Sequence, residues 1–283
     1  MAAVLCLLAA GCGTQLLYNR LDTVAYFYLA TQVSLQPTQS ASLKSALRDY
    51  LDWHRSTELP RYAAFIETLA AEAAAPLGAA RINAARLEIE SLWRGSVARG
   101  APAAASWLAG LDPEQVDELF ASLGEDDADL RDEYCNASEA DRDRDRLKSF
   151  VAAAEDWVGR LSPAQRVLIA GRLVALVPSS CGWVESRQLV RATLRETVER
   201  RRREPGFTAE VIALLTRPED RWQNAYRAAF DRNRVAIVGL LAELDASLTA
   251  KQRARMVSRL AGFADDFRKL SASRAQVAQA ATR

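Results

Sequence analysis

The stretch LKSFVAAAEDWVGRLSPAQRVLIAGRLV, residues 147–174, decides the fold class of this chain. Its apolar residues recur every three or four positions, which is the period of one helical face. Gly159 and the Ser162-Pro163 pair interrupt the pattern, and the apolar period resumes at Val167 and Leu168. The stretch therefore predicts two consecutive amphipathic helices separated by a short turn.

The same period extends outward in both directions from this stretch. Further apolar stripes of this kind begin at Leu43, Tyr62, Ile82, Trp222 and Met256. Alternating runs of β-branched residues, which are typical of strands, are absent from the sequence. The sequence predicts an all-α fold, built as a multi-helix orthogonal or bundle-like array with two lobes.

Four short boxes with one layout mark expected helix starts, namely LQPTQ at 35–39, LDPEQ at 111–115, LSPAQ at 161–165 and LTAKQ at 248–252. In three of them Pro follows a polar N-cap residue, and in all four Gln stands at the third helical position. From there the Gln side chain can reach back to the backbone N–H of the cap. The unequal spacing of the boxes excludes a solenoid of fixed period.

Breakers and charge suggest how the chain is divided. We expect a lipoprotein signal peptide at 1–11, a lipidated aromatic-rich lead-in at 12–33, one helical domain at 34–270 and a flexible tail at 271–283. Within the domain, lobes 34–123 and 147–270 would be joined by the highly charged segment 124–146. That segment is interpreted as a linker or an exposed helix.

The N-terminus, MAAVLCLLAAGC, resembles the lipobox of bacterial lipoproteins. The resemblance implies cleavage before Cys12 and acylation of that residue, which would then anchor the chain to membrane lipid. Gly13 in place of Asp resembles an outer-membrane sorting signal. No Lys or Arg precedes Arg20, so we expect the true start codon to lie upstream. The alternative is a short apolar tail, because a spanning helix needs roughly 20 residues.

Composition limits the possible partners. The chain has 37 basic and 36 acidic residues, and this balance offers no overall field to attract nucleic acid. We therefore expect no nucleic-acid partner. No motif implies a cofactor.

Two cysteines outside the N-terminal run, Cys135 and Cys181, are candidates for a disulfide in an oxidising compartment. A bridge between them would stabilise the fold by about 4 kcal/mol in the chain-entropy model. The alternative is two unpaired cysteines, with Cys181 buried as a small hydrophobic residue.

His54 is the only histidine of the chain, and it lies on an apolar helical stripe. One interpretation makes it a general base oriented by Glu58, with Arg61 completing a candidate functional cluster. A packed structural role is the more common use of a single histidine on such a stripe. A second histidine is absent, and no nucleophile motif is present, so we predict neither a metal site nor a catalytic residue.

Two resemblances bear on function. The four boxes resemble the LTxxQ motifs of periplasmic stress chaperones, although capping alone explains the residues. More specifically, LYNRLD at 17–22 and WHRSTELPRYAAF at 53–65 resemble segments of uncharacterised helical lipoproteins of Gram-negative bacteria, whose domain is one of unknown function. That resemblance implies helices and lipid anchoring, and it implies no catalytic residue.

The expected function is that of a non-enzymatic interaction or scaffold protein of the cell envelope. It would be anchored to membrane lipid through Cys12, on the periplasmic face of the outer membrane, and would bind an unknown envelope protein. One alternative is a periplasmic chaperone or stress-sensor-like protein. A further alternative is an unfamiliar envelope hydrolase that uses His54 and Glu58.

Overall fold

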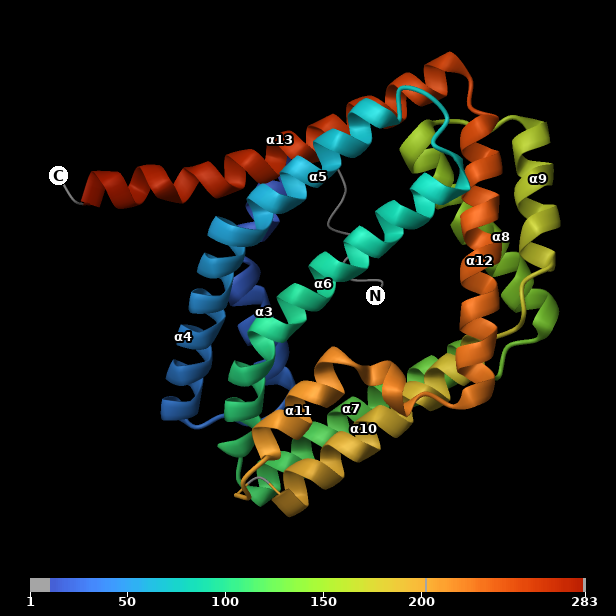
Figure 1. Ribbon diagram of the computed structural model, residues 1–283. Helices are drawn as coiled ribbons and strands as arrows, with labels where there is room; N and C mark the ends of the chain where they lie inside the picture. Colours follow the sequence, from blue (N-terminus) through green and yellow to red (C-terminus); the bar gives the residue numbers. More distant parts are fainter. Residues whose placement is uncertain (1–10, 202, 282–283) are drawn as a thin grey trace. The chain divides into compact units, whose positions relative to one another are not determined.

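The computed structural model describes residues 11–201 and 203–281, and it describes side chains over 15–200 and 203–272. The predicted all-α fold is confirmed: the described residues form helices joined by short turns and contain no strand (Figure 1). The expected signal peptide at 1–11 lies outside the described residues, except for Gly11. Cys12 belongs to helix α2, and its side chain also lies outside the described residues.

The chain forms two compact units. Unit 1 combines Met1–Ala75 with Ala254–Arg283, and unit 2 is Pro76–Arg253. This division differs from the expected lobes 34–123 and 147–270. The long C-terminal helix α13, Ala250–Ala281, packs with the N-terminal helices, a long-range pairing that no local sequence pattern specifies.

Unit 1 contains α2 (Gly11–Tyr18), α3 (Leu21–Gln32), α4 (Pro37–Trp53), the π-helix η2 (His54–Glu58), α5 (Leu59–Glu72) and most of α13. Helix α3 packs against α4, and α5 runs beside α13 in Figure 1. Arg268 of α13 forms an ion pair with Glu67 of α5. The core of the unit includes the buried side chains of Tyr18, Leu59 and Leu270.

Unit 2 contains α6 (Gly78–Ala109), α7 (Pro113–Tyr134), α8 (Glu139–Val158), α9 (Pro163–Val174), α10 (Ser180–Arg201), α11 (Phe207–Thr216), η3 (Pro218–Arg221), α12 (Asn224–Ala246) and the start of α13. Helix α6 packs against α11 and α12, α7 against α10, and α8 against α9. Fully buried side chains at the centre of this array are Ile169, Val184, Val198, Val211 and Leu240.

The charged segment 124–146 lies inside unit 2 and forms the end of α7 and the start of α8. Of the two interpretations, a linker or an exposed helix, the structure agrees with the helix, interrupted by one short turn. Its charges pair along the helix, as in the exposed pair Arg144–Asp141 at 2.5 Å and the partly buried pair Arg146–Asp143 at 2.5 Å. At the C-terminal end of the chain, α13 continues to Ala281, so the described part of the expected tail 271–283 has a helical backbone.

The four boxes begin helices, as predicted. The backbone N–H groups of Gln36, Asp112, Ser162 and Thr249 each donate to the side-chain oxygen of the Gln three residues later, at 2.9–3.0 Å. Two of these glutamines also meet each other. Gln165 and Gln252 are buried and exchange two amide hydrogen bonds of 3.0 Å, which join the start of α9 to the start of α13 within unit 2.

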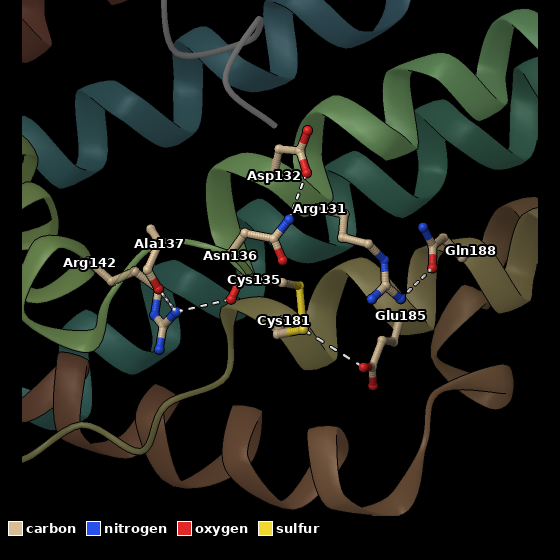
Figure 2. Close-up of a disulfide and its surroundings, with 9 residues drawn as sticks. All are labelled: Arg131, Asp132, Cys135, Asn136, Ala137, Arg142, Cys181, Glu185 and Gln188. Atoms are coloured by element: carbon tan, nitrogen blue, oxygen red, sulfur yellow. Dashed lines mark hydrogen bonds between the residues drawn. A yellow bond between two sulfur atoms is a disulfide. The ribbon is translucent and has the colours of Figure 1, made fainter.

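A disulfide joins Cys135, the C-cap residue of α7, to Cys181 in the first turn of α10 (Figure 2). From the sequence, a disulfide and two unpaired cysteines are both possible outcomes. The Cα atoms are 4.8 Å apart, within the range that disulfides normally span. Beside it, the guanidinium of Arg142 donates to the carbonyl oxygens of Cys135 and Ala137, so the turn between α7 and α8 is tied to the bridge.

Farther along the contact of α7 with α10, a buried carboxylate is paired with two arginines. Asp127 is 5% exposed, and its two oxygens bind Arg187 Nε at 2.9 Å and Arg191 Nη1 at 2.6 Å. The negative charge is therefore compensated where it is removed from water. Together with the disulfide, this cluster holds α7 and α10 in one register.

Candidate functional site

The candidate site lies within unit 1, where a short π-helix interrupts the path from α4 into α5. Pro60 has no backbone N–H, so it cannot donate the α-helical hydrogen bond to the residue four positions earlier. The backbone responds over His54–Glu58, and the N–H of Leu59 donates to the carbonyl of His54, five residues before it. Such π-helical turns are rare and frequently occur at functional sites. The Pro60 of the sequence thus displaces the side chains of His54 and Glu58 from their α-helical positions.

His54 is half-buried among four aromatic rings, and we call this set the His54 cluster. Its ring centroid lies within 5.4–6.3 Å of the ring centroids of Tyr18, Tyr50, Trp53 and Tyr62. Tyr62 in turn contacts Phe267 of α13 edge-on. The cluster therefore joins α2, α4, α5 and α13.

One hydrogen bond within the His54 cluster fixes the histidine. The hydroxyl oxygen of Tyr18 lies 2.8 Å from Nδ1 of His54. Burial raises the pKa of Tyr18, so the hydroxyl keeps its proton and can donate it to an unprotonated Nδ1. The proton of the neutral imidazole then belongs on Nε2.

The charge state of His54 follows from its surroundings. Burial lowers the pKa of His54, the nearby Glu58 carboxylate opposes that change, and the Arg55 guanidinium adds to it. Burial is the largest of the three effects, so the pKa lies below the ordinary value of 6.5. His54 is neutral at physiological pH.

Arg55 ties the N-terminal segment to the same place. Its guanidinium lies 4.8 Å from the ring centroid of Tyr18, a cation–π contact. It also donates to the side-chain oxygen of Asn19 at 3.0 Å and to the backbone carbonyl of Leu270 at 3.1 Å. Side chains from LYNRLD and from WHRSTELPRYAAF therefore contact each other directly.

The structure also places the other two members of the predicted cluster. Glu58 is 2% exposed, and its Oε1 accepts a hydrogen bond from Arg61 Nη1 at 2.8 Å. Its second oxygen, Oε2, is buried and accepts no hydrogen bond within the described part of the chain. His54, Glu58 and Arg61 thus form one neighbourhood, in which Arg61 pairs with Glu58 and the Glu58 charge acts on His54.

Sequence reasoning missed the most direct partners of His54. From the sequence, Tyr18 is expected only as part of the aromatic-rich lead-in, and Tyr50 and Tyr62 only as members of apolar stripes. The available signal was that Tyr18, Trp53 and Tyr62 all belong to the two segments that carry the lipoprotein resemblance. In the structure, side chains of these two segments contact each other.

The described residues offer neither a metal centre nor a membrane span. No group of three His, Cys, Asp or Glu side chains within them could hold a metal ion. Likewise, none of the helices searched in the described ranges combines the length and apolar character that crossing a bilayer needs.

Comparison with known proteins identifies the family of the chain. No curated protein and no solved structure matches it. Residues 31–227 match the model of a family of unknown function, DUF6279. The matched region includes His54, Glu58 and Arg61 and both bridged cysteines, whereas Tyr18 and Phe267 lie outside it. Because the match covers more than half of the chain, the protein belongs to this family of unknown function, DUF6279.

Proposed function

We propose that this protein is a lipid-anchored, non-enzymatic interaction protein of the Gram-negative cell envelope. Acylated Cys12 would hold it on the periplasmic face of the outer membrane, and the helical body would bind another envelope protein. The observation that carries the proposal is the attachment of the segment directly after Cys12 to the body. Tyr18 and Asn19 of that segment bond to His54 and Arg55, so the anchor would be rigidly connected to unit 1.

The state of His54 supports a structural role for it. A general base needs an available lone pair on the imidazole. If Nδ1 accepts the hydrogen bond of Tyr18 and Nε2 carries a proton, neither nitrogen has a lone pair available for a substrate. Of the two oxygens of the Glu58 carboxylate, Oε1 is engaged by Arg61 and Oε2 is buried. We therefore favour positioning of the N-terminal segment over hydrolysis as the role of this neighbourhood.

Exposed apolar residues on unit 2 support binding of a protein partner. Ile89 and Trp93 are exposed one helical turn apart on α6, and Val167 and Val174 are exposed two turns apart on α9. Apolar side chains grouped on one helical face are typical of helix-in-groove recognition. These two faces are the surfaces we propose for the unknown envelope partner.

The first experiment tests the anchor. The protein is expressed from its native locus, so that any upstream start codon is retained, and cells are labelled with radioactive palmitate. We expect label on the wild-type protein, recovery in the outer-membrane fraction, and loss of both in Cys12→Ala. Wild-type protein without label, or Cys12→Ala that keeps the label, contradicts the proposal.

A second experiment tests partner binding. Crosslinking in intact cells is followed by mass spectrometry for the wild-type protein, for Trp93→Glu and for Val174→Glu. A specific crosslinked envelope protein that is lost in one of these variants supports the proposal. Crosslinks that are the same in all three proteins contradict the assignment of these faces.

A further inference from the structure

Helix α3 has an outward face without charge. Val24, Phe27, Tyr28 and Thr31 follow the i, i+3, i+4, i+7 spacing of one helical stripe and are all exposed. The exposed fractions are 47% for Val24, 61% for Phe27 and 53% for Tyr28. Asp22 is the single charged residue among Leu21–Gln32. We call these four residues the α3 stripe.

The rest of α3 is held by unit 1, so the α3 stripe is not simply an unpacked end. Leu21 packs against the buried core that contains Tyr18 and Leu270. The ammonium of Lys44 on α4 lies 4.2 Å from the ring centroid of Tyr26. Gln32 and Val33, at the end of the helix, are buried. The fold thus fixes one side of α3 and presents the α3 stripe on the other.

We propose that the α3 stripe lies in the interfacial region of the lipid bilayer. This inference rests on the proposed anchoring through Cys12. About a dozen residues separate Cys12 from Val24, and most of them are helical. At about 1.5 Å per helical residue, this path keeps Val24, the first residue of the α3 stripe, within roughly 20 Å of the acylated residue. The N-terminal end of the α3 stripe would therefore lie close to the membrane that holds the proposed anchor.

The side chains of the α3 stripe are suited to the interfacial region of a bilayer. Phe and Tyr side chains are enriched at membrane interfaces, where an apolar ring and a polar hydroxyl are both accommodated. The exposed Leu16 and Leu17 of α2 lie on the path between the anchor and the α3 stripe. The exposed basic side chain of Arg20, next to the start of α3, is suited to lipid phosphates. Asp22, two residues later, limits this electrostatic contribution.

The cysteine pattern makes a direct test possible. In the processed, acylated protein Cys6 would be removed, Cys12 blocked by lipid, and Cys135 and Cys181 joined to each other. Phe27→Cys then provides the single free thiol for a nitroxide spin label. Thr68→Cys is the matched control, because Thr68 is an exposed residue on α5 of the same unit.

The labelled lipoproteins are placed in vesicles of phosphatidylethanolamine and phosphatidylglycerol. Relaxation of the label is then measured with oxygen, which partitions into lipid, and with a water-soluble nickel chelate. We expect oxygen accessibility to exceed chelate accessibility several-fold at position 27 and the reverse order at position 68. Circular dichroism checks that both variants keep their helices.

Equal, water-like accessibility at positions 27 and 68 overturns the inference. So does a label at position 27 that is immobilised in native membranes and water-exposed in pure lipid vesicles, because that result indicates a protein occupant. Failure of the anchor itself is recognised separately: Cys12 then appears by mass spectrometry as an unmodified residue, and the variants do not bind the vesicles.

Discussion

The hydroxyl oxygen of Tyr18 lies 2.8 Å from Nδ1 of His54, a residue 36 positions later in the sequence. This bond closes the N-terminal segment onto the π-helix that Pro60 imposes. Burial stabilises the neutral form of both partners, since it raises the pKa of Tyr18 and lowers that of His54. The buried site therefore favours the neutral form of each partner.

The first prediction concerns pH. Because the folded pKa of His54 is lower than its unfolded value, the unfolded chain binds more protons in the interval between them, and stability falls as pH decreases through about 6.5. Urea unfolding at about pH 7.5 and about pH 5.5 measures the loss. In His54→Gln we expect a smaller loss over the same interval. An equal loss in both proteins would assign the effect to other groups.

The second prediction concerns the hydroxyl of Tyr18. Tyr18→Phe keeps the ring beside Arg55 and removes only the bond to His54, so we expect unfolding free energy to fall by about 1 kcal/mol. Thermal and urea unfolding provide the measurement. Tyr28→Phe is the control, because Tyr28 is exposed on α3, and we expect a change within about 0.5 kcal/mol. Equal effects of the two substitutions would mean that the hydrogen bond between Tyr18 and His54 does not contribute to the free energy of unfolding.

The third prediction concerns the disulfide between Cys135 and Cys181. The bridge closes a loop with a sequence separation of 46, and the chain-entropy model gives a stabilisation of about 4 kcal/mol. The double variant Cys135→Ser/Cys181→Ser should lose about that much unfolding free energy. Dithiothreitol should lower the unfolding temperature of the wild-type protein and leave that of the variant unchanged. A wild-type protein insensitive to reduction would contradict the bridge.

The helices could be predicted from the sequence because their signals are local. In the boxes at Asp112 and Ser162, the cap and the Gln that bonds to it are three residues apart, so one short window contains both partners. Apolar stripes likewise need only one helix. The division into units could not be predicted from local signals. It depends on the packing of α13 with the N-terminal helices, which are separated from it by most of the chain.

The candidate site could be predicted only in part, for a related reason. His54 and Glu58 are four residues apart and Arg61 follows three residues later, so their nearness in space can be expected from spacing alone. Tyr18 and Phe267 reach the cluster from distant parts of the chain, and their spacing from His54 carries no information about contact. The π-helix also differs from the expectation, because the pairing of His54 with Glu58 presumes α-helical spacing over a segment that is π-helical.

The fourth prediction concerns the buried charge of Asp127. Asp127→Asn removes the carboxylate that pairs with Arg187 and Arg191, of which Arg191 is mostly buried, and leaves their positive charges uncompensated. We expect a loss of about 3 kcal/mol in unfolding free energy. The control is Asp231→Asn, since its pair with Arg234 lies on the surface of α12, and it should change stability by less than about 1 kcal/mol. Similar losses in both variants would refute the distinction.

The fifth prediction concerns the pairing of Gln165 with Gln252. Each amide bonds to the other and also caps its own helix, so a double-mutant cycle is needed to isolate the shared part. Gln165→Ala and Gln252→Ala should each destabilise the protein, and the double variant should fall short of additivity by about 1 kcal/mol or more.

The control cycle pairs Gln165→Ala with Asp143→Asn. Within the described residues these two side chains share no hydrogen-bonding partner, so their effects should add to within about 0.5 kcal/mol. Urea unfolding of all the variants supplies the free energies. Additivity in the Gln165 and Gln252 cycle as well would mean that the bonds between these two amides do not stabilise the fold. Non-additivity confined to that cycle would show that a local start signal also joins α9 to α13.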